Sequence, residues 1–466
     1  MNLAELTQNL PPARTVAEAR AEIAKQLTES RTQLVVVDDD PTGTQTVHGV
    51  RVYMDWSHET LRQALTSGNT ASFISANTRA LKSDEVRELA RTIGQHVREA
   101  ARMENMNVVV ASRSDSTLRG HFPCEVDSLL EGLEWDCDGI ILAPGFFEAG
   151  RYTIDDVQWV ASGDEVVPAS ETEFAKDPTF GYKNSSLPRW VEEKTQGAVR
   201  ADQVRSIPLE TTRTLGPEAV AAELMKASDK QPVVVNAACY EDLEVFMLGL
   251  LAAEARGKRF IYRCAAPFVK VRAGIQTRAL LTSDEIGSAD GPGLIVVGSY
   301  VGKTSRQLDS LIGAGLATGV ELRAELLMDE SRREPEIQRV AQWIDERMAA
   351  RESVAVYTSR ATVSSNDTHF LDIGSVIMSS LCRVVSSLSR RPGFLIAKGG
   401  ITSMEVARLG LGIKGAAVLG QILDGVPVWR LGKEAKWTGI PYVVFPGNVG
   451  DDDALRDTVR ALRGTE

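Results

Sequence analysis

The sequence lacks the features that mark zinc-binding, membrane and nucleic-acid-binding proteins. Its five cysteines are scattered and form no CxxC pair, which argues against a zinc site and suits a reducing compartment. No apolar run approaches the roughly 20 residues of a membrane-spanning helix, and the N-terminus has no apolar signal segment. A formal charge of -11 argues against nucleic-acid binding, which requires a basic surface. We therefore expect a cytoplasmic protein, and this charge still allows a small anionic ligand.

The length and the order of the predicted elements indicate an α/β protein with more than one domain. A chain of 466 residues is long for a single core. Hydrophobic residues make up 43% and charged residues 25%, which is ordinary for a globular protein. Short β-branched runs alternate with amphipathic segments, such as the helix predicted over residues 83–104. This alternation favours mainly parallel sheets flanked by helices.

The stretch LVVVDDDPTGTQT, residues 34–46, carries the strongest local signal. Four apolar residues predict a short buried strand. The chain then turns into three adjacent carboxylates, Asp38, Asp39 and Asp40. Because like charges repel, such a cluster is expected to hold a cation, an amino group or a hydroxyl that loses its proton. The structural alternative is an acidic turn that caps a helix starting near Gly43.

The same arrangement occurs four times in the first half of the chain. Each time a predicted buried strand ends in a polar loop, and the loops cover residues 38–44, 77–79, 113–119 and 144–153. The carboxyl ends of parallel strands lie at one edge of the sheet, where α/β proteins bind ligands. We therefore expect the four loops to line one edge and to contribute to a single site.

The charged side chains of these loops suit a small polyhydroxylated anion. Arg113 and Arg119 flank Asp115 and two hydroxyl residues, so guanidinium groups and hydroxyls lie together. Further arginines follow in the second and fourth loops, at Arg79 and Arg151. An internal network of salt bridges among the loops is the structural alternative, although it would not need the hydroxyl residues and the glycines. We favour a ligand site.

Residues 161–195 interrupt the alternation of strands and helices. They are rich in polar and turn residues and have little periodicity, which is typical of a lid, a binding loop or an interface. Glu171, Thr172, Asp177 and Tyr182 are the side chains of this insert that could reach a substrate.

A glycine-containing segment with little apolar content, residues 282–293, predicts a linker. We therefore place an N-terminal domain at residues 1–285, including the polar insert, and a C-terminal domain at residues 286–466.

The C-terminal half contains three strand–turn–helix segments with glycines in the turns. They are GLIVVGSYVGKTSRQ, GFLIAKGGITS and YVVFPGNVGDDDAL. Such turns bring backbone N–H groups and a helix N-terminus to a phosphate. Only three residues separate Gly298 from Gly302, where a P-loop has four, so a true P-loop is not expected. The aspartates at 451–453 are expected to cap the following helix first and to bind metal second.

Six motifs in this order resemble the four-carbon acid sugar kinase family. They are DDDPTGTQT, SRSDSTLRG, APGFFEAGRYT, VVGSYVGKTSRQ, AKGGITS and FPGNVGDDDAL, and they span nearly the whole chain. The resemblance implies an N-terminal sugar-acid-binding domain and a C-terminal nucleotide-binding domain, with the active site in the cleft between them. It implies transfer of a phosphoryl group from ATP, with Mg²⁺, to the 4-hydroxyl of an acid such as threonate, erythronate or 3-oxo-tetronate.

The resemblance also implies roles for individual residues. Asp39 or Asp40 takes the proton of the terminal hydroxyl, and arginines of the DSTLRG loop clamp the carboxylate of the acid. The expected substrate-binding residues are Asp38, Thr42, Gly43, Asn77, Arg79, Arg113, Asp115, Ser116, Thr117, Arg119 and Arg151. The expected nucleotide-binding residues are Ser299, Thr304, Gly399, Gly400, Ile401, Thr402, Gly447 and Asn448. No direct metal ligand is assigned, and a homodimer is left open.

The chain departs from the usual motifs of that family at several points. The usual DDLTGA is DDPTGT, preceded by Asp38; arginine replaces lysine at Arg113; and GGET has become GGIT at Ile401. The polar insert is also longer than in well-known members. These departures leave the identity of the acid open.

Two alternative functions come from other classes of protein. VVVDDDPTGT also satisfies the hhhDxDxT pattern of haloacid-dehalogenase-like phosphatases, in which Asp38 would be the nucleophile and Asp40 the acid. Asp451 and Asp452 would then bind Mg²⁺. Such phosphatases do not require the DSTLRG loop or the glycine turns, which argues against this interpretation. A sugar-acid sensor without catalytic activity is the third hypothesis, and it would not consume ATP.

Overall fold

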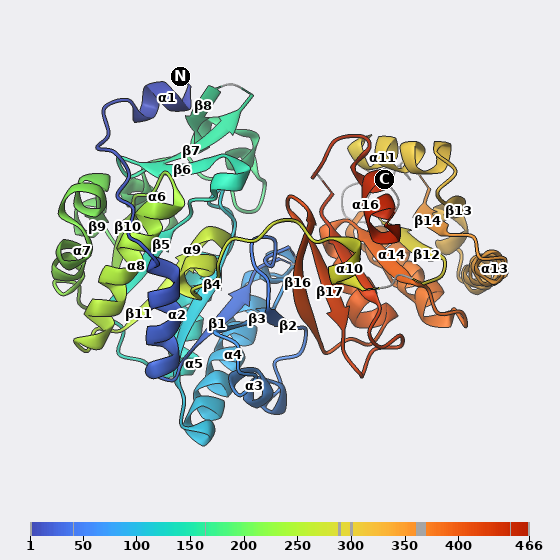
Figure 1. The fold of residues 1–466 in the computed structure, drawn as a ribbon, viewed down its shortest axis with the longest axis horizontal. Coiled ribbons are helices and arrows are strands. Elements are labelled where there is room, and N and C mark those ends of the chain that lie inside the picture. The colour runs from blue at the N-terminus through green and yellow to red at the C-terminus, as the bar shows by residue number, and fades with distance from the viewer. Residues whose placement is uncertain are drawn as a thin grey trace. The chain divides into compact units, whose positions relative to one another are not determined.

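The computed structural model describes residues 2–40, 42–163, 165–287, 290–298, 302–359, 370–447 and 449–464. The chain forms two compact units (Figure 1). The N-terminal unit comprises residues 1–43 and 55–277, and the C-terminal unit comprises residues 44–54 and 278–466. We expected one division, after residue 285; the second compact unit begins at residue 278 and also includes residues 44–54. Strand β2 (Val50–Tyr53) in this segment pairs antiparallel with β16 (Gly415–Leu423).

The N-terminal unit is built on a sheet whose strands run parallel. In spatial order they are β3 (Ala71–Ser75), β1 (Thr32–Asp38), β4 (Asn107–Arg113), β11 (Phe260–Cys264), β5 (Gly139–Ala143), β10 (Gln231–Val235) and β9 (Arg205–Ile207). Most of the strand residues are buried, because helices cover both faces of the sheet. This explains why the strands read as continuous apolar runs.

Two groups of helices cover the opposite faces of this sheet (Figure 1). One group is α2 (Ala19–Glu29), α7 (Pro217–Leu224), α8 (Tyr240–Ala255) and α9 (Ala266–Arg272), and the other is α3 (His58–Leu65), α4 (Ser83–Glu104) and α5 (Cys124–Leu133). Val86, Ala90 and Ile93 lie on the buried side of α4 at helical spacing. Gly94 lets α4 and α5 approach closely, since a Cβ there would lie 2.5 Å from the carbonyl oxygen of Leu129. A short helix, α1 (Leu3–Thr7), precedes these elements.

The polar insert contains more regular structure than its composition indicated. Three short strands, β6 (Arg151–Ile154), β7 (Val157–Ser162) and β8 (Glu165–Pro168), form a small antiparallel sheet. The chain continues through the 3₁₀ turns η3 (Ala169–Glu171) and η4 (Glu173–Lys176) into helix α6 (Leu187–Lys194). Elements this short contain too few residues to give a periodic signal.

The C-terminal unit contains a mixed sheet. Its parallel part is β13 (Thr318–Leu322), β14 (Val354–Thr358), β12 (Gly293–Val297), β15 (Phe394–Lys398) and β18 (Pro441–Phe445), and its antiparallel part is β17 (Val426–Leu431), β16 and β2. Helices pack in two groups: α10 (Ser283–Ile286), α11 (Gly302–Gly313) and α16 (Ala454–Arg463), and α12 (Ala324–Leu327), α13 (Glu330–Ala349), α14 (Phe370–Ser387) and α15 (Gly400–Glu405). Helix α10 lies in the segment that we had expected to be a linker.

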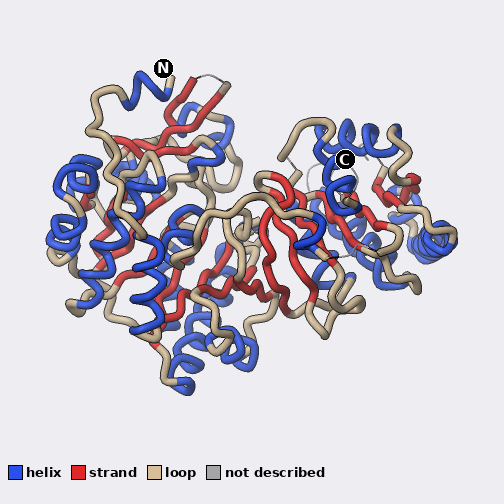
Figure 2. The backbone as a smooth tube through the Cα atoms, in the orientation of Figure 1, coloured by secondary structure: helices blue, strands red, loops and turns tan. Residues whose placement is uncertain are grey.

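The prediction of two α/β domains with mainly parallel sheets is confirmed. Both units alternate strands with helices, as the red and blue segments of the tube show (Figure 2). Among the described residues, we find no helix with the length and apolar character needed to cross a lipid bilayer.

Candidate active site

The loops that follow β1, β3, β4 and β5 lie at one edge of the N-terminal sheet, as predicted. These strands run parallel, and β1 lies between β3 and β4. In the strand register, Asp38 is the partner of both Ser75 and Arg113. The strand pairing therefore brings the first aspartate and an arginine from distant parts of the sequence to the same level of the sheet.

Arg113 contacts all three carboxylates of the aspartate cluster. Its Nε lies 2.9 Å from Oδ1 of Asp38, and its Nη1 lies 3.3 Å from Oδ1 of Asp39. Its Nη2 lies 3.2 Å from Oδ1 of Asp40. One planar guanidinium thus offsets much of the repulsion that three adjacent carboxylates would otherwise produce.

Arg79 joins the aspartate cluster to the loop after β4. Its Nε lies 3.3 Å from Oδ2 of Asp39, its Nη2 pairs with Asp40, and its Nη1 lies 3.6 Å from Oδ1 of Asp115. Asp115 in turn accepts a hydrogen bond of 2.7 Å from Nε of Arg119. The salt-bridge network that we had considered as an alternative therefore exists, and it joins the loops that follow β1, β3 and β4.

The three aspartates differ in exposure and in electrostatic environment. The side chains of Asp38 and Asp39 are 2% exposed, whereas that of Asp40 is 20% exposed. Burial raises the pKa of Asp38 to about 8 against the opposing effect of Arg113, and burial likewise raises the pKa of Asp39. Asp40 is therefore the carboxylate of this cluster that a dissolved ligand can reach.

Asp115 has the opposite electrostatic environment. Burial alone would raise the pKa of Asp115, but Arg79 and Arg119 lower it to about 2. The side chain of Thr117 also donates a hydrogen bond to this carboxylate. Asp115 is therefore ionised at neutral pH and serves to hold the arginines.

The turn after the aspartates is closely packed. Thr42 donates hydrogen bonds from its backbone nitrogen and its Oγ1 to Oδ1 of Asp40, at 2.7 and 2.6 Å. Gly43 lies against Asp38, and a Cβ at this position would overlap the Asp38 carboxylate. The residues after Gly43 form a turn, so the helix that we considered as an alternative is absent from the described residues 42–49.

We expect Gly43→Ala to lower kcat/KM by about 100-fold, because the new methyl group must displace the Asp38 carboxylate and the turn that holds Asp40. Steady-state kinetics and thermal unfolding measure this effect. Gly313→Ala is the matched control, since no atom lies within 4 Å of a Cβ built at that helix end. Equal kinetics for the two variants would show that the Asp38 carboxylate has room to move.

The remaining predicted residues of the N-terminal unit support the backbone of the site. The backbone nitrogen of Asn77 donates to the carbonyl oxygen of Asp38 at 3.1 Å, and Asn77 adopts a left-handed conformation with φ of 51°. Ser116 is buried, and its carbonyl oxygen accepts a hydrogen bond of 2.7 Å from Gln158. Arg151 lies at the start of β6 and makes no ion pair with the aspartate cluster in the described part of the chain.

Two buried charged residues of this site were not identified from the sequence. Glu125, in the first turn of α5, accepts hydrogen bonds from Thr78 at 2.6 Å and from Ser112 at 2.7 Å. Arg263, near the end of β11, donates to the carbonyl oxygen of Arg119 at 3.1 Å. An arginine within the apolar strand FIYRC is a signal that could have been recognised. The sequence around Glu125 gives no such signal, because an acidic residue in the first turn of a helix is common.

The predicted nucleotide-binding turns come together within the C-terminal unit. They follow β12, β15 and β18, which run parallel, and the register aligns Lys398 with Val297 and with Phe445. Oγ1 of Thr304 donates to the carbonyl oxygen of Gly447 at 3.4 Å, and the nitrogen of Gly399 donates to the carbonyl oxygen of Phe445 at 2.8 Å. The three segments therefore converge.

Individual members of this group have distinct environments. Gly298 lies directly against Thr402, because a Cβ at position 298 would overlap the Thr402 hydroxyl. Gly400 begins α15, and the neighbouring Ile401 is 58% exposed, which is unusual for a large apolar side chain. The predicted residues Ser299 and Asn448 lie outside the described residues.

Lys398, which was not identified from the sequence, is the central cation of these turns. Its side chain is fully buried at the end of β15. Its Nζ donates to the carbonyl oxygens of Pro446 at 2.6 Å and Gly447 at 3.2 Å. Burial, together with the nearby charge of Lys303, lowers the pKa of Lys398 to about 7. Two lysines at converging glycine turns favour the binding of an anion.

The aspartates at positions 451–453 lie at the start of helix α16, but the side chain at its N-cap makes no capping hydrogen bond and pairs with neighbouring side chains instead. Asp453 is its N-cap residue, and the Asp453 side chain accepts a hydrogen bond of 2.6 Å from Ser310. Asp452 forms an ion pair of 2.9 Å with Arg306. These contacts do not favour the phosphatase alternative, in which Asp451 and Asp452 bind Mg²⁺. Nor does Asp38, its required nucleophile, which is 2% exposed and paired with Arg113.

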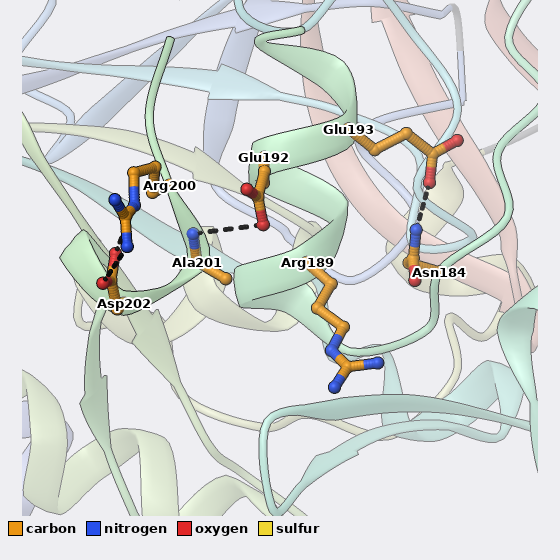
Figure 3. A pocket seen from close by; sticks show the side chains of 7 residues that line it. All are labelled: Asn184, Arg189, Glu192, Glu193, Arg200, Ala201 and Asp202. Carbon is orange, nitrogen blue, oxygen red and sulfur yellow. Dashed lines mark hydrogen bonds and ion pairs between the residues drawn. The ribbon is translucent and has the colours of Figure 1, made fainter. Parts of the chain in front are cut away.

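A surface hollow of about 610 Å³ lies elsewhere in the N-terminal unit (Figure 3). It is lined by Asn184, Arg189, Glu192, Glu193, Arg200, Ala201 and Asp202. Most of its polar groups bind one another: Arg200 pairs with Asp202 at 2.7 Å, and Asn184 donates to Glu193 at 2.7 Å. The hollow contains none of the predicted site residues, and we do not assign the reaction to it.

The aspartate cluster has the type of ligand atoms that a hard cation such as Mg²⁺ prefers, but its carboxylates are already paired with Arg79 and Arg113. The three residues each offer a carboxylate oxygen, and these oxygens lie within 4.8 Å of one another. Carboxylate oxygens are preferred ligands of Mg²⁺.

Family models match both units of the chain. The model of a sugar-binding N-terminal domain matches residues 34–272, and the model of a nucleotide-binding C-terminal domain matches residues 294–455. A D-threonate kinase of Bordetella bronchiseptica is 28% identical over 361 residues, which are 75% of this chain and 76% of the relative. A D-erythronate kinase of Heliobacterium modesticaldum is 25% identical over 450 residues, which are 90% of this chain and 95% of the relative.

Solved structures share the fold. A crystal structure of a Salmonella typhimurium LT2 protein matches 94% of this chain and 100% of its own, with a TM-score of 0.68 and 18% sequence identity. At that identity the likeness speaks for the fold alone. The domain models and the kinase relatives together show that the protein is a phosphotransferase with a hydroxyl group as acceptor. The chain belongs to the four-carbon acid sugar kinase family.

Proposed function

We propose that this enzyme transfers the γ-phosphoryl group of ATP to the terminal hydroxyl of a four-carbon sugar acid. The acids considered are of the threonate, erythronate and 3-oxo-tetronate type. The relatives, a D-threonate kinase and a D-erythronate kinase, support this class of acceptor. The two relatives act on acids of different stereochemistry according to their names, so the proposal does not choose between these acids. The assay described below identifies the preferred acid.

The observation that carries the proposal is the single partly exposed carboxylate in an otherwise buried, arginine-matched cluster. Asp40 exposes 20% of its side chain, while Asp38 and Asp39 expose 2% each. A catalytic base must reach the proton that it removes, and the ion pairs with Arg79 and Arg113 fix the Asp40 carboxylate in place. We assign Asp40 as the base.

In the proposed mechanism, the arginines bind the acid and Asp40 accepts the proton of its terminal hydroxyl. The oxygen then attacks the γ-phosphorus of ATP, the bond to the β-phosphate oxygen breaks, and ADP leaves. Such a transfer depends mainly on alignment and charge stabilisation rather than on covalent chemistry by the protein. The buried arginines and the hydrogen-bonded turn at Thr42 supply the fixed positions that alignment requires.

The glycine turns of the C-terminal unit are proposed to hold the nucleotide. Backbone N–H groups and the first turn of α11 suit phosphate oxygens, and Lys303 and Lys398 add positive charge. When bound, Mg²⁺ would neutralise negative charge on the phosphates.

A coupled assay of ADP release tests the proposed function. The enzyme is given ATP with Mg²⁺ and a panel of threonates, erythronates, 3-oxo-tetronates and longer sugar acids. We expect ADP formation that depends on one four-carbon acid, with a product that carries phosphate at the terminal carbon. No ADP release with any acid, combined with phosphate release from phosphorylated sugars without ATP, would contradict the kinase assignment.

A further inference from the structure

Ion pairing in the N-terminal unit distinguishes one arginine from the others. Arg79 and Arg113 contact the aspartate cluster, and Arg119 contacts Asp115. Arg151 has no carboxylate within 4.0 Å among the residues that the structure describes. Every other arginine of the four loops is thus offset by a carboxylate of the protein, and Arg151 is not.

The surroundings of Arg151 leave its guanidinium short of hydrogen-bond acceptors. Its Nη1 donates to the carbonyl oxygen of Ala149 in the preceding turn, while its Nε is buried without a hydrogen-bond partner. Burial lowers the pKa of Arg151, Asp115 acts in the opposite direction, and Arg119 lowers the pKa further. A half-buried cation with an unused donor gains most from an anionic ligand, which supplies both charge and acceptors.

An aromatic side chain of the polar insert holds Arg151 beside Arg119. The ring centroid of Phe174, in η4, lies 4.9 Å from Cζ of Arg119 and 5.9 Å from Cζ of Arg151. The negative face of an aromatic ring attracts cations. This attraction offsets part of the repulsion between the two guanidinium groups and keeps them together.

The insert is fixed to the DSTLRG loop by two further contacts. Oδ2 of Asp177 lies 3.8 Å from Nη1 of Arg119, and the hydroxyl of Tyr182 donates to the carbonyl oxygen of Thr117 at 2.8 Å. Tyr182 is buried. The insert therefore holds Phe174 in a defined position against the two arginines.

Resting on the proposed function, we propose that Arg151 binds the carboxylate of the sugar acid and that Phe174 positions it for this task. The charge of Arg119 is already offset by Asp115 and Asp177. The charge of Arg151 is offset only when the carboxylate of the substrate binds. This arrangement makes the enzyme select sugar acids over neutral polyols of the same length. Phe174 acts through the arginines and is a positioning residue.

The test compares a sugar acid with uncharged analogues of equal length, the primary amide and the alditol. Each is measured as a substrate at saturating ATP, or as a competitive inhibitor where it is not phosphorylated. We expect Arg151→Gln to weaken use of the acid by about 100-fold, mainly through KM, and to leave the neutral analogues within about threefold. The use of the acid by Arg151→Lys should lie between that of the unmodified enzyme and that of Arg151→Gln. Lysine keeps the positive charge but lacks the planar guanidinium that can bind both carboxylate oxygens. Arg189→Gln, an exposed arginine beside the hollow in Figure 3, is the control and should match the unmodified enzyme.

The positioning role is tested on the insert itself. Phe174→Leu should raise KM for the acid about three- to tenfold and leave kcat and the neutral analogues nearly unchanged. Phe180→Leu is its matched control, because the ring of Phe180, another aromatic residue of the insert, packs edge-on against His121 with 4.8 Å between the ring centroids.

The outcomes separate this inference from the proposed function. If the unmodified enzyme phosphorylates no four-carbon acid, the proposed function fails, whatever the variants do. If it phosphorylates an acid and Arg151→Gln keeps the original preference for acid over amide, the inference is overturned. Should Arg151→Gln fail to fold, Arg151→Lys and Phe174→Leu decide the question by the same ratio. An unchanged acid-to-amide preference in both would overturn the inference equally.

Discussion

Replacing Asp40 with asparagine should lower kcat for the preferred sugar acid by about 10²- to 10⁴-fold, the range associated with loss of a general base. The amide keeps the size of the side chain but cannot accept the proton of the hydroxyl. Nucleotide binding should change little, because the predicted nucleotide residues lie on other segments, which follow β12, β15 and β18. Single-turnover kinetics with saturating ATP and isothermal titration with a nucleotide measure the two effects separately.

The controls for this variant address folding and charge. Asp202→Asn removes an exposed aspartate outside the site and should leave kcat unchanged. Asp40→Glu keeps a carboxylate but moves it, and should retain more activity than Asp40→Asn. Turnover of Asp40→Asn close to that of the unmodified enzyme would remove the base assignment, provided that thermal unfolding shows an intact fold.

Replacing Lys398 with methionine should weaken nucleotide binding by about 10- to 100-fold at pH 6.5. This factor corresponds to the loss of one interaction with a charged group. Methionine has a similar length but carries no charge and donates no hydrogen bond to Pro446 or Gly447. The measurement is nucleotide affinity by titration calorimetry, which does not depend on the identity of the sugar acid.

The same lysine predicts how nucleotide affinity depends on pH. Because the pKa of Lys398 is lowered to about 7, the side chain is a cation below that pH and becomes neutral above it. The cation attracts phosphates, so affinity should be highest below pH 7 and should fall as the pH rises through 7. In Lys398→Met the part of this dependence that comes from Lys398 should disappear, whereas Lys433→Met, a change at an exposed lysine, should retain it. The nucleotide phosphates titrate in every variant alike. Equal slopes for Lys398→Met and Lys433→Met would therefore refute the role of Lys398.

Much of the N-terminal site follows from local sequence signals. A β-branched run that ends in Asp38 predicts a buried strand and a polar loop, and β1 ends at Asp38. Three further loops repeat the pattern, and the parallel order of β3, β1 and β4 brings them to one edge. Strand and loop signals are local, because hydrophobic spacing and turn residues act within a few positions of one another.

Local signals were insufficient where the structure depends on contacts between segments that are far apart in the sequence. Residues 44–54 follow the aspartates directly, yet β2 pairs with β16, more than 360 residues later in the chain. Phe174 lies in a stretch with no periodicity, and only tertiary packing sets its ring against Arg119 and Arg151. Lys398 and Arg263 are charged residues in apolar strands. The sequence there predicts burial but does not show which groups accept their hydrogen bonds.

The sequence by itself determined the alternation of strands and helices, the acidic and arginine-rich loops, and the glycine turns, because each depends on neighbouring residues. The tertiary structure alone decided how the charges are matched. It buries Asp38 and Asp39, leaves Asp40 partly exposed, and offsets every loop arginine except Arg151 among the described residues. Burial and ion pairing depend on which segments meet in space, and the free energy of a charge depends on those neighbours rather than on its position in the chain.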